Sequence, residues 1–139
     1  MARSVFVDTS AWYALINRRD ALHSRTRTLL ETLTRERARL VTTDYVIDES
    51  CTLTKLRAGA EAASRLLQLL DETAMVGWEW IGADRFARAK ALFVSQRDQG
   101  YSFTDCTSFV VMREGRIEEA LTSDHHFTVA GFRPLLRSG

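Results

Sequence analysis

The feature that most constrains the fold of this chain is a regular alternation of short apolar runs with longer segments of helical periodicity. The apolar runs are rich in β-branched and aromatic residues, as buried strands are. They occupy residues 4–7, 39–43, 75–81, 119–123 and 132–136. Helical patterns lie between them, at residues 10–19, 21–38, 44–57, 60–70, 83–98 and 102–115. Because strands separated by helices run in the same direction, we expect an α/β fold whose parallel sheet is covered by helices on both faces.

Individual residues predict details of these elements. Val76, Trp78 and Trp80 alternate with polar or small residues, which predicts a half-buried strand. Pro134 is tolerated only at the edge of a sheet, so the last strand is expected there. Asp44 is predicted to cap the helix that begins beside it.

Composition narrows the class of protein. The chain has 139 residues and 45% of them are hydrophobic, which suits one compact domain over residues 1–139. The net charge is only +1, so a global basic field for nucleic acid is absent, although nearly all of the 19 basic residues are arginine. Arginine excess is typical either of phosphate recognition or of genomic base composition, and the even spread of acids favours the second.

No segment has the length of a signal-peptide core or a membrane span, so we expect a cytoplasmic protein with no membrane partner. Cys51 and Cys106 are too few for a disulfide scaffold, and both are expected to be buried as small apolar residues.

Three aspartates are predicted to meet at one edge of the sheet. Asp8 and Asp124 directly follow the first and fourth predicted strands. Asp105 lies in the first turn of the last predicted helix, which Ser102 or Thr104 caps. Helices between parallel strands begin at the carboxyl edge of the sheet, where ligand sites of such folds form. The three carboxylates should therefore project toward the same place.

Glu49 is predicted to be the fourth acid of this group. On a helix it shares a face with Val46, Leu53 and Leu56, at offsets of three, four and seven, whereas the adjacent Asp48 points to solvent. A glutamate on an apolar face is costly unless it is paired or binds a metal ion. The pattern therefore assigns Glu49, and not Asp48, to the site.

Each acid also has a purely structural explanation. Asp8 can cap a helix, Asp105 can interact with a helix dipole, and Asp124 can begin a turn. Capping is a sufficient explanation for Asp44, which is left out of the group. Four acids at one edge, with no Lys or Arg in their segments, are harder to explain in this way, since like charges repel and a divalent cation relieves the repulsion.

All-carboxylate ligation favours hard cations, so the predicted cofactor is Mg²⁺ or Mn²⁺. His125 and His126 are adjacent and are not expected to direct both rings at one ion, so they are expected to be loop residues rather than zinc ligands. Such a metal site suits hydrolysis of phosphodiester bonds, because a metal-bound water can act as the nucleophile.

These residues carry a resemblance to a known family. The segments "VFVDTSAWYAL", "VIDES", "SFTDCTSFVVM", "ALTSDHHF" and "AGFRPL" follow one another in the order typical of PIN-domain ribonucleases. The chain most closely resembles the VapC-type toxins of bacterial toxin–antitoxin pairs. The match is spread over nearly the whole chain.

The resemblance implies a Rossmann-like PIN domain with four or five parallel strands, and an Mg²⁺- or Mn²⁺-dependent endoribonuclease. It implies that Asp8 and Asp105 are the principal metal ligands and that Glu49 and Asp124 complete the acidic quartet. Ser10 matches a small hydroxyl residue that supports the first acid. It further implies a homodimer, an RNA substrate and a small cognate antitoxin whose tail occupies the groove. Residues 44–70 fit the helical pair that covers the site.

Other functions remain as alternatives. An aspartyl phosphatase would need a second aspartate where Ser10 stands, and a receiver-like domain would need a lysine after a late strand. A catalytically weak PIN domain that only binds RNA or protein would usually lack one of the four acids. Metal-dependent cleavage separates this last alternative from the ribonuclease.

Overall fold

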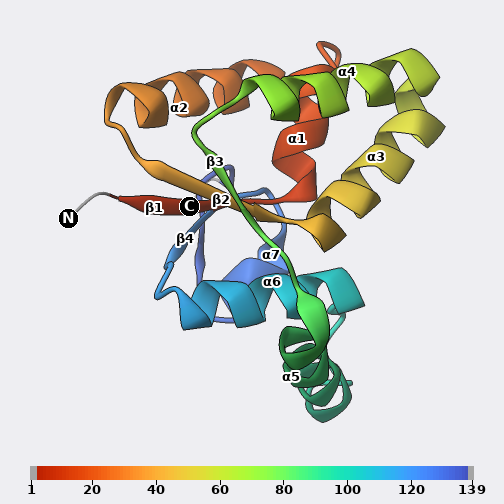
Figure 1. The fold of residues 1–139 in the computed structure, drawn as a ribbon, viewed down its shortest axis with the longest axis vertical. Coiled ribbons are helices and arrows are strands. Elements are labelled where there is room, and N and C mark those ends of the chain that lie inside the picture. The colour runs from red at the N-terminus through yellow and green to blue at the C-terminus, as the bar shows by residue number, and fades with distance from the viewer. Residues whose placement is uncertain (1–2, 138–139) are drawn as a thin grey trace.

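A computed structural model describes residues 3–137 and shows alternating strands and helices (Figure 1). The strands are β1 (Ser4–Val7), β2 (Arg39–Thr43), β3 (Val76–Glu79), β4 (Glu119–Leu121) and β5 (Arg133–Pro134). The helices are α1 (Thr9–Ile16), α2 (His23–Arg35), α3 (Asp44–Ala58), α4 (Ala60–Glu72), α5 (Gly82–Ser95), α6 (Phe103–Glu114) and α7 (His125–Val129). The predicted α/β class is confirmed.

The five strands form one parallel sheet in the order β3-β2-β1-β4-β5. The chain first moves outward from β1 through β2 to β3, and then returns to the other side of β1 to place β4 and β5. The strand order therefore reverses between β1 and β4, and the carboxyl ends of these two strands flank the crevice in which such folds bind ligands. Pro134 lies in the edge strand β5, as predicted.

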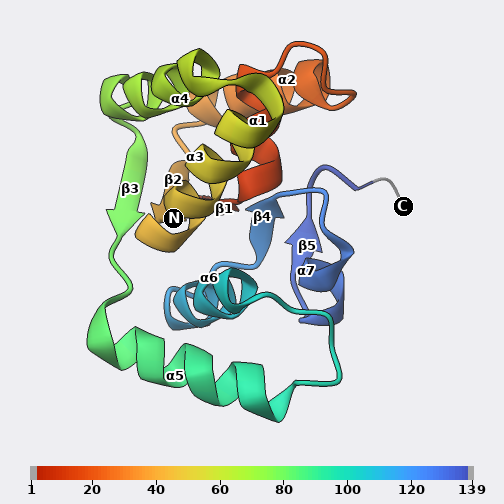
Figure 2. The same cartoon turned by 90° about the vertical axis from the view of Figure 1, so that its right-hand side faces the viewer.

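Helices cover both faces of the sheet (Figure 2). Helices α1 to α4 lie on one face, and α6 and α7 lie on the other, with α5 outside α6. Only Ala89 of α5 is buried, so this helix rests on α6 rather than on the sheet. Its Phe86 and Phe93 lie against Phe103, with ring centroids 5.1 and 5.7 Å away.

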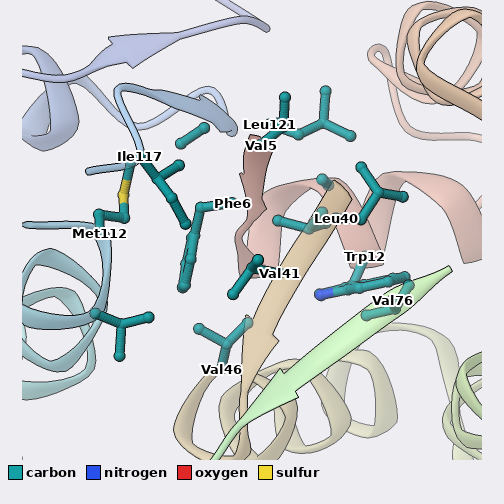
Figure 3. Close-up of a cluster of buried hydrophobic side chains, with 14 of the residues drawn as sticks. Val5, Phe6, Trp12, Leu40, Val41, Val46, Val76, Met112, Ile117 and Leu121 are labelled. Atoms are coloured by element: carbon teal, nitrogen blue, oxygen red, sulfur yellow. The ribbon is translucent and has the colours of Figure 1, made fainter. Parts of the chain in front are cut away.

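The core lies between the sheet and these helices (Figure 3). Phe6 points toward Met112 and Ile117, whereas Trp12 lies beside Leu40 on the other side of the sheet. These side chains are fully or almost fully buried. Burial on both faces explains why Val5, Phe6 and Val7 of β1 are all apolar, because alternate residues face different helical layers.

The structure corrects the prediction for the third strand. The alternating residues do not form one buried face, since Trp78 is 37% and Trp80 is 68% exposed. Strand β3 is at the edge of the sheet and ends at Glu79, and Val76 is its only buried residue. The two tryptophan rings stack on each other, with centroids 5.9 Å apart.

Helix boundaries also differ from prediction for local reasons. Thr43, and not Asp44, caps α3, because its hydroxyl accepts a hydrogen bond from Val46 N at 3.1 Å. Asp44 Oδ1 instead accepts from Ile81 N at 3.0 Å. Helix α2 ends before Ala38, because Arg37 adopts a positive φ of 56° that a helix does not allow.

Cys106 is buried as predicted, but Cys51 is only partly buried. Within residues 3–137, none of the helices combines the length and the apolar character needed to cross a membrane.

Candidate active site

Asp8 is placed at the site by the end of β1. It follows the strand directly, and its backbone continues the pairing with β4 through Asp8 N and Leu121 O at 3.2 Å. Asp8 is the N-cap residue of α1, but its side chain makes no capping hydrogen bond. The capping explanation therefore does not account for its carboxylate. Asp8 as a residue is only 6% exposed, and it lines the hollow described below.

Thr122 anchors the carboxylate of Asp8. The pairing of Val7 with Leu121 sets Asp8 opposite Thr122, whose hydroxyl donates to Asp8 Oδ2 at 2.9 Å. The only proton of this hydroxyl is used in the bond to Asp8, so in its other two hydrogen bonds the Thr122 oxygen is the acceptor. The donors are Ser10 Oγ at 3.1 Å and Asp124 N at 3.2 Å. Ser10 Oγ in turn accepts from Ser123 N. Ser10 thus supports Asp8 through Thr122 and not by direct contact.

Asp105 is held by the start of α6. Its side chain accepts from Ser102 N at 3.0 Å, and its own N–H donates to Ser102 Oγ at 2.9 Å, which together form a capping box. Ser102, rather than Thr104, is therefore the cap. The capping box uses Asp105 Oδ2 and fixes the orientation of the carboxylate, which is 8% exposed.

Asp124 begins α7 and accepts from His126 N at 2.9 Å. His126 Nδ1 lies 3.0 Å from Asp124 Oδ1 and 3.8 Å from Asp105 Oδ2, so its ring bridges the two acids. One ring nitrogen each of His125 and His126 and one oxygen of Asp124 lie within 4.8 Å of one another. The prediction that the histidines are loop residues is wrong, because the cap at Asp124 starts a helix that includes both of them.

Glu49 is the acid whose predicted environment differs most from the observed one. It is exposed rather than part of the apolar face, and Leu56 is exposed as well. The buried face of α3 consists of Val46, Ile47, Ser50 and Thr54. The hydroxyl of Ser50 is satisfied within the helix by donating to Val46 O, so small polar residues can be buried there. Glu49 nevertheless points toward the site, where it lines the same hollow as Asp8 and Asp124.

This hollow has a volume of about 270 Å³ at the carboxyl edge of the sheet. It is lined by Asp8, Thr9, Ser10, Tyr13, Asp20, Leu22, Glu49, Leu53, Arg57, Ser123 and Asp124. Arg57 shows that the site does contain a cation, contrary to the expectation from its segments. Glu49, Leu53 and Arg57 follow one another at intervals of four residues on α3, a spacing that could have identified Arg57. Thr122 could not be identified in this way, because its role depends on strand register.

The carboxylates influence one another electrostatically. Burial, together with repulsion from Asp105 and Glu49, raises the pKa of Asp8 to about 7. Burial, together with repulsion from Asp124 and Glu49, raises the pKa of Asp105 to about 6, although the ring of His126 opposes this. Asp8, Glu49 and Asp124 thus line the hollow, whereas Asp105 does not line it but is repelled by Glu49 and Asp124 and itself repels Asp8. Buried, mutually repelling carboxylates are typical of sites that bind a divalent cation.

The donor set fits a hard divalent cation. Asp8 and Asp105 offer nearly buried carboxylates that are held by hydrogen bonds from Thr122 and Ser102. Carboxylate oxygens are the ligands that Mg²⁺ and Mn²⁺ prefer, and fixed outer partners orient such ligands. Asp124 and Glu49 lie at the same hollow and complete the negative charge.

Comparisons with known proteins identify the family of the chain. Residues 5–133 match the family model of the PIN domain. The chain is 36% identical over 128 residues to the 23S rRNA-specific endonuclease VapC20 from two strains of Mycobacterium tuberculosis, covering 92% of this chain and 95% of the relative. A crystal structure of M. tuberculosis VapC20, described as a sarcin-ricin loop cleaving toxin, superposes with a TM-score of 0.84 at 34% identity, covering 92% and 95% of the two chains. The predicted resemblance is confirmed, and the chain belongs to the PIN-domain family.

Proposed function

We propose that this protein is a metal-dependent endoribonuclease that acts as the toxin of a type II toxin–antitoxin pair. The observation that supports this most directly is that Asp8, Glu49 and Asp124 line one hollow at the carboxyl edge of the sheet. Asp105 is near enough to raise the pKa of Asp8, and the ring of His126 joins it to Asp124. The similar VapC20 proteins are named as endonucleases of 23S rRNA, which makes the sarcin-ricin loop the first RNA to test.

The residues of the site have separate roles in this proposal. Asp8 and Asp105 hold Mg²⁺ or Mn²⁺, and Thr122 and Ser102 keep their oxygens in place. Asp124 and Glu49, at the same hollow, are assigned to orienting water and the remaining cation ligands. The ion, when bound, supplies charge stabilisation for the phosphate and lowers the pKa of the attacking water.

The deciding experiment is cleavage of ribosomal RNA by purified protein with Mg²⁺ or Mn²⁺, and again with EDTA. Asp8→Asn and Glu49→Gln are expected to lose cleavage. Asp48→Asn is the matched control, because Asp48 is an exposed acid beside Glu49 that does not line the hollow. Discrete, metal-dependent cleavage by the wild type and the control alone supports the ribonuclease.

A catalytically weak PIN domain that binds RNA or protein is the alternative. It predicts RNA binding without cleavage, and Asp8→Asn would then bind RNA as the wild type does. Cleavage that persists equally in Asp8→Asn would contradict both the assignment of the site and the proposed role of the metal.

The homodimer and the antitoxin belong to the same proposal. A second copy is supported by apolar side chains exposed along the continuous segment β3–α5, namely Trp78, Trp80, Phe86 and Phe93. Light scattering should give the mass of a dimer, and Trp80→Ser should shift it toward the monomer. A cognate antitoxin should co-purify and suppress cleavage. The organisation of residues 1–139 as one domain stays a prediction.

A further inference from the structure

A second hollow, larger than the acidic one, lies beside it. It has a volume of about 870 Å³ and lies between the end of α1 with its following loop and the turn that joins α3 to α4. It is lined by Leu15, Ile16, Asn17, Arg18, Arg19, Arg57, Ala58, Ala62 and Arg65. Four of these residues are arginines and none is acidic.

No acidic side chain among residues 3–137 pairs with the four arginines Arg18, Arg19, Arg57 and Arg65. Within residues 3–137, none of their guanidinium groups forms an ion pair or donates a hydrogen bond. All four side chains are exposed, so their hydrogen-bond donors are accessible to a ligand.

A hollow at the opposite edge of the sheet provides a comparison. It has a volume of about 730 Å³ and is also lined by arginines, among them Arg3 and Arg133. There, however, Glu119 neutralises them, at 2.7 Å from Arg3 and 3.8 Å from Arg133. Among the described residues, only Arg116 of the three arginines in that hollow lacks an ion pair, whereas all four arginines lack one in the hollow beside the acids.

The arginine-lined hollow is continuous with the acidic one. Arg57 lines both. Its guanidinium lies 5.6 Å from the ring centre of Tyr13, which lines the acidic hollow, and Asn17 of the arginine-lined hollow donates to Tyr13 Oη at 2.9 Å. A polyanion that reaches the carboxylates can therefore continue over Tyr13 and Arg57 onto Arg18, Arg19 and Arg65.

We propose that Arg18, Arg19, Arg57 and Arg65 bind the sugar–phosphate backbone of RNA on one side of the scissile bond. This inference rests on the proposed function. Arginine forms paired hydrogen bonds to phosphate oxygens, and phosphate contacts supply affinity and register but carry no sequence information. In a chain of net charge +1, the attraction has to come from such a local cluster, because the overall field is weak. The choice of sequence must then be made elsewhere on the protein.

The test compares two triple variants that remove the same charge. The groove variant is Arg18→Gln/Arg19→Gln/Arg65→Gln; Arg57 is left intact because it also lines the acidic hollow. The control variant is Arg35→Gln/Arg37→Gln/Arg116→Gln, whose exposed arginines lie just before β2 and β4 at the opposite edge of the sheet. Fluorescence anisotropy of labelled poly(U), in EDTA and at several KCl concentrations, measures backbone binding without cleavage or base recognition.

The groove variant is expected to bind poly(U) more weakly, and the slope of log affinity against log salt should fall by about 2, since each lost phosphate contact on a single strand contributes about 0.7. The control variant should keep the slope of the wild type. A wild-type slope in the groove variant would overturn the proposal. This would hold even if the same variant bound an antitoxin more weakly, because the arginines would then serve the antitoxin and not RNA. Absence of poly(U) binding by the wild type would overturn it as well.

Two measurements distinguish failure of the arginine site from failure of the ribonuclease proposal on which it rests. Mn²⁺ binding, measured by calorimetry without RNA, should be equal in the wild type and the groove variant, because none of the substituted arginines lines the acidic hollow. A wild type that binds poly(U) through the groove but never cleaves RNA would refute the ribonuclease and leave the backbone site standing.

Discussion

Replacing Asp8 by Asn should stabilise the metal-free protein while abolishing its cleavage of RNA. Asp8 is buried, and burial and the nearby carboxylates raise its pKa to about 7. At pH 8 the folded protein must keep this group ionised in an unfavourable place. Asparagine removes the charge and retains a carbonyl oxygen that can accept the hydrogen bond from Thr122.

The magnitude follows from the difference between the pKa of Asp8 in the folded protein and the pKa of an aspartate exposed to water. Folding raises this pKa from 3.8 to about 7. At about 1.4 kcal/mol per pKa unit, a change of this size corresponds to roughly 4 kcal/mol as an upper value. We expect a gain of about 2 to 4 kcal/mol in the free energy of unfolding, which is roughly a 10 °C rise in Tm for a chain of this size.

The dependence on pH has a defined sign. Because the folded pKa of Asp8 is the higher one, the folded state binds more protons between pH 3.8 and about 7. The stability contributed by protonated Asp8 is fully present below this window and is lost as the pH rises through it. The variant and the wild type should therefore differ little near pH 4 and most at pH 8.

Thermal unfolding followed by circular dichroism, in EDTA across this pH range, measures the effect. Added Mn²⁺ should then raise the Tm of the wild type much more than that of the variant, since only the wild type retains the full ligand set. An Asp8→Asn variant that is less stable than the wild type at pH 8, or that keeps the same pH dependence, would refute the reasoning.

Two further predictions follow from the same structure. Thr122→Val removes a hydroxyl that donates to Asp8 and that favours the ionised carboxylate by lowering the pKa of Asp8. Mn²⁺ binding measured by calorimetry should therefore weaken about 10-fold or more, as expected for loss of a hydrogen bond to a charged group. An unchanged affinity would show that Thr122 does not support the metal site. Phe109→Ala should lower the free energy of unfolding in urea by about 3 to 5 kcal/mol, because Phe109 is fully buried against Tyr101, Phe127 and Phe132. Leu67→Ala is its control, because Leu67 of α4 is 47% exposed, and equal losses in the two variants would contradict the assigned core.

Much of the acidic site could be predicted from the sequence because it depends on chain direction. Asp8 and Asp124 follow strands and Asp105 begins a helix, so in any parallel sheet all three lie at the carboxyl edge. The prediction for Glu49 was right about its neighbours at the site but wrong about its burial. Helical periodicity gives relative positions on a helix, whereas its rotation depends on what packs against it.

Tertiary structure decided the features that join distant segments. Thr122 reaches Asp8 only because Val7 pairs with Leu121, and strand register is set by packing rather than by either strand alone. The arginine-lined hollow combines the end of α1 with α3 and α4, and arginine content alone could not distinguish it from neutralised arginines elsewhere. The sequence by itself determined the order of the elements and the edge at which the acids lie, because both follow from local periodicity and chain direction. The register, the rotation of α3 and the grouping of free arginines depend on contacts between segments far apart in the chain, and only the packed structure defines those.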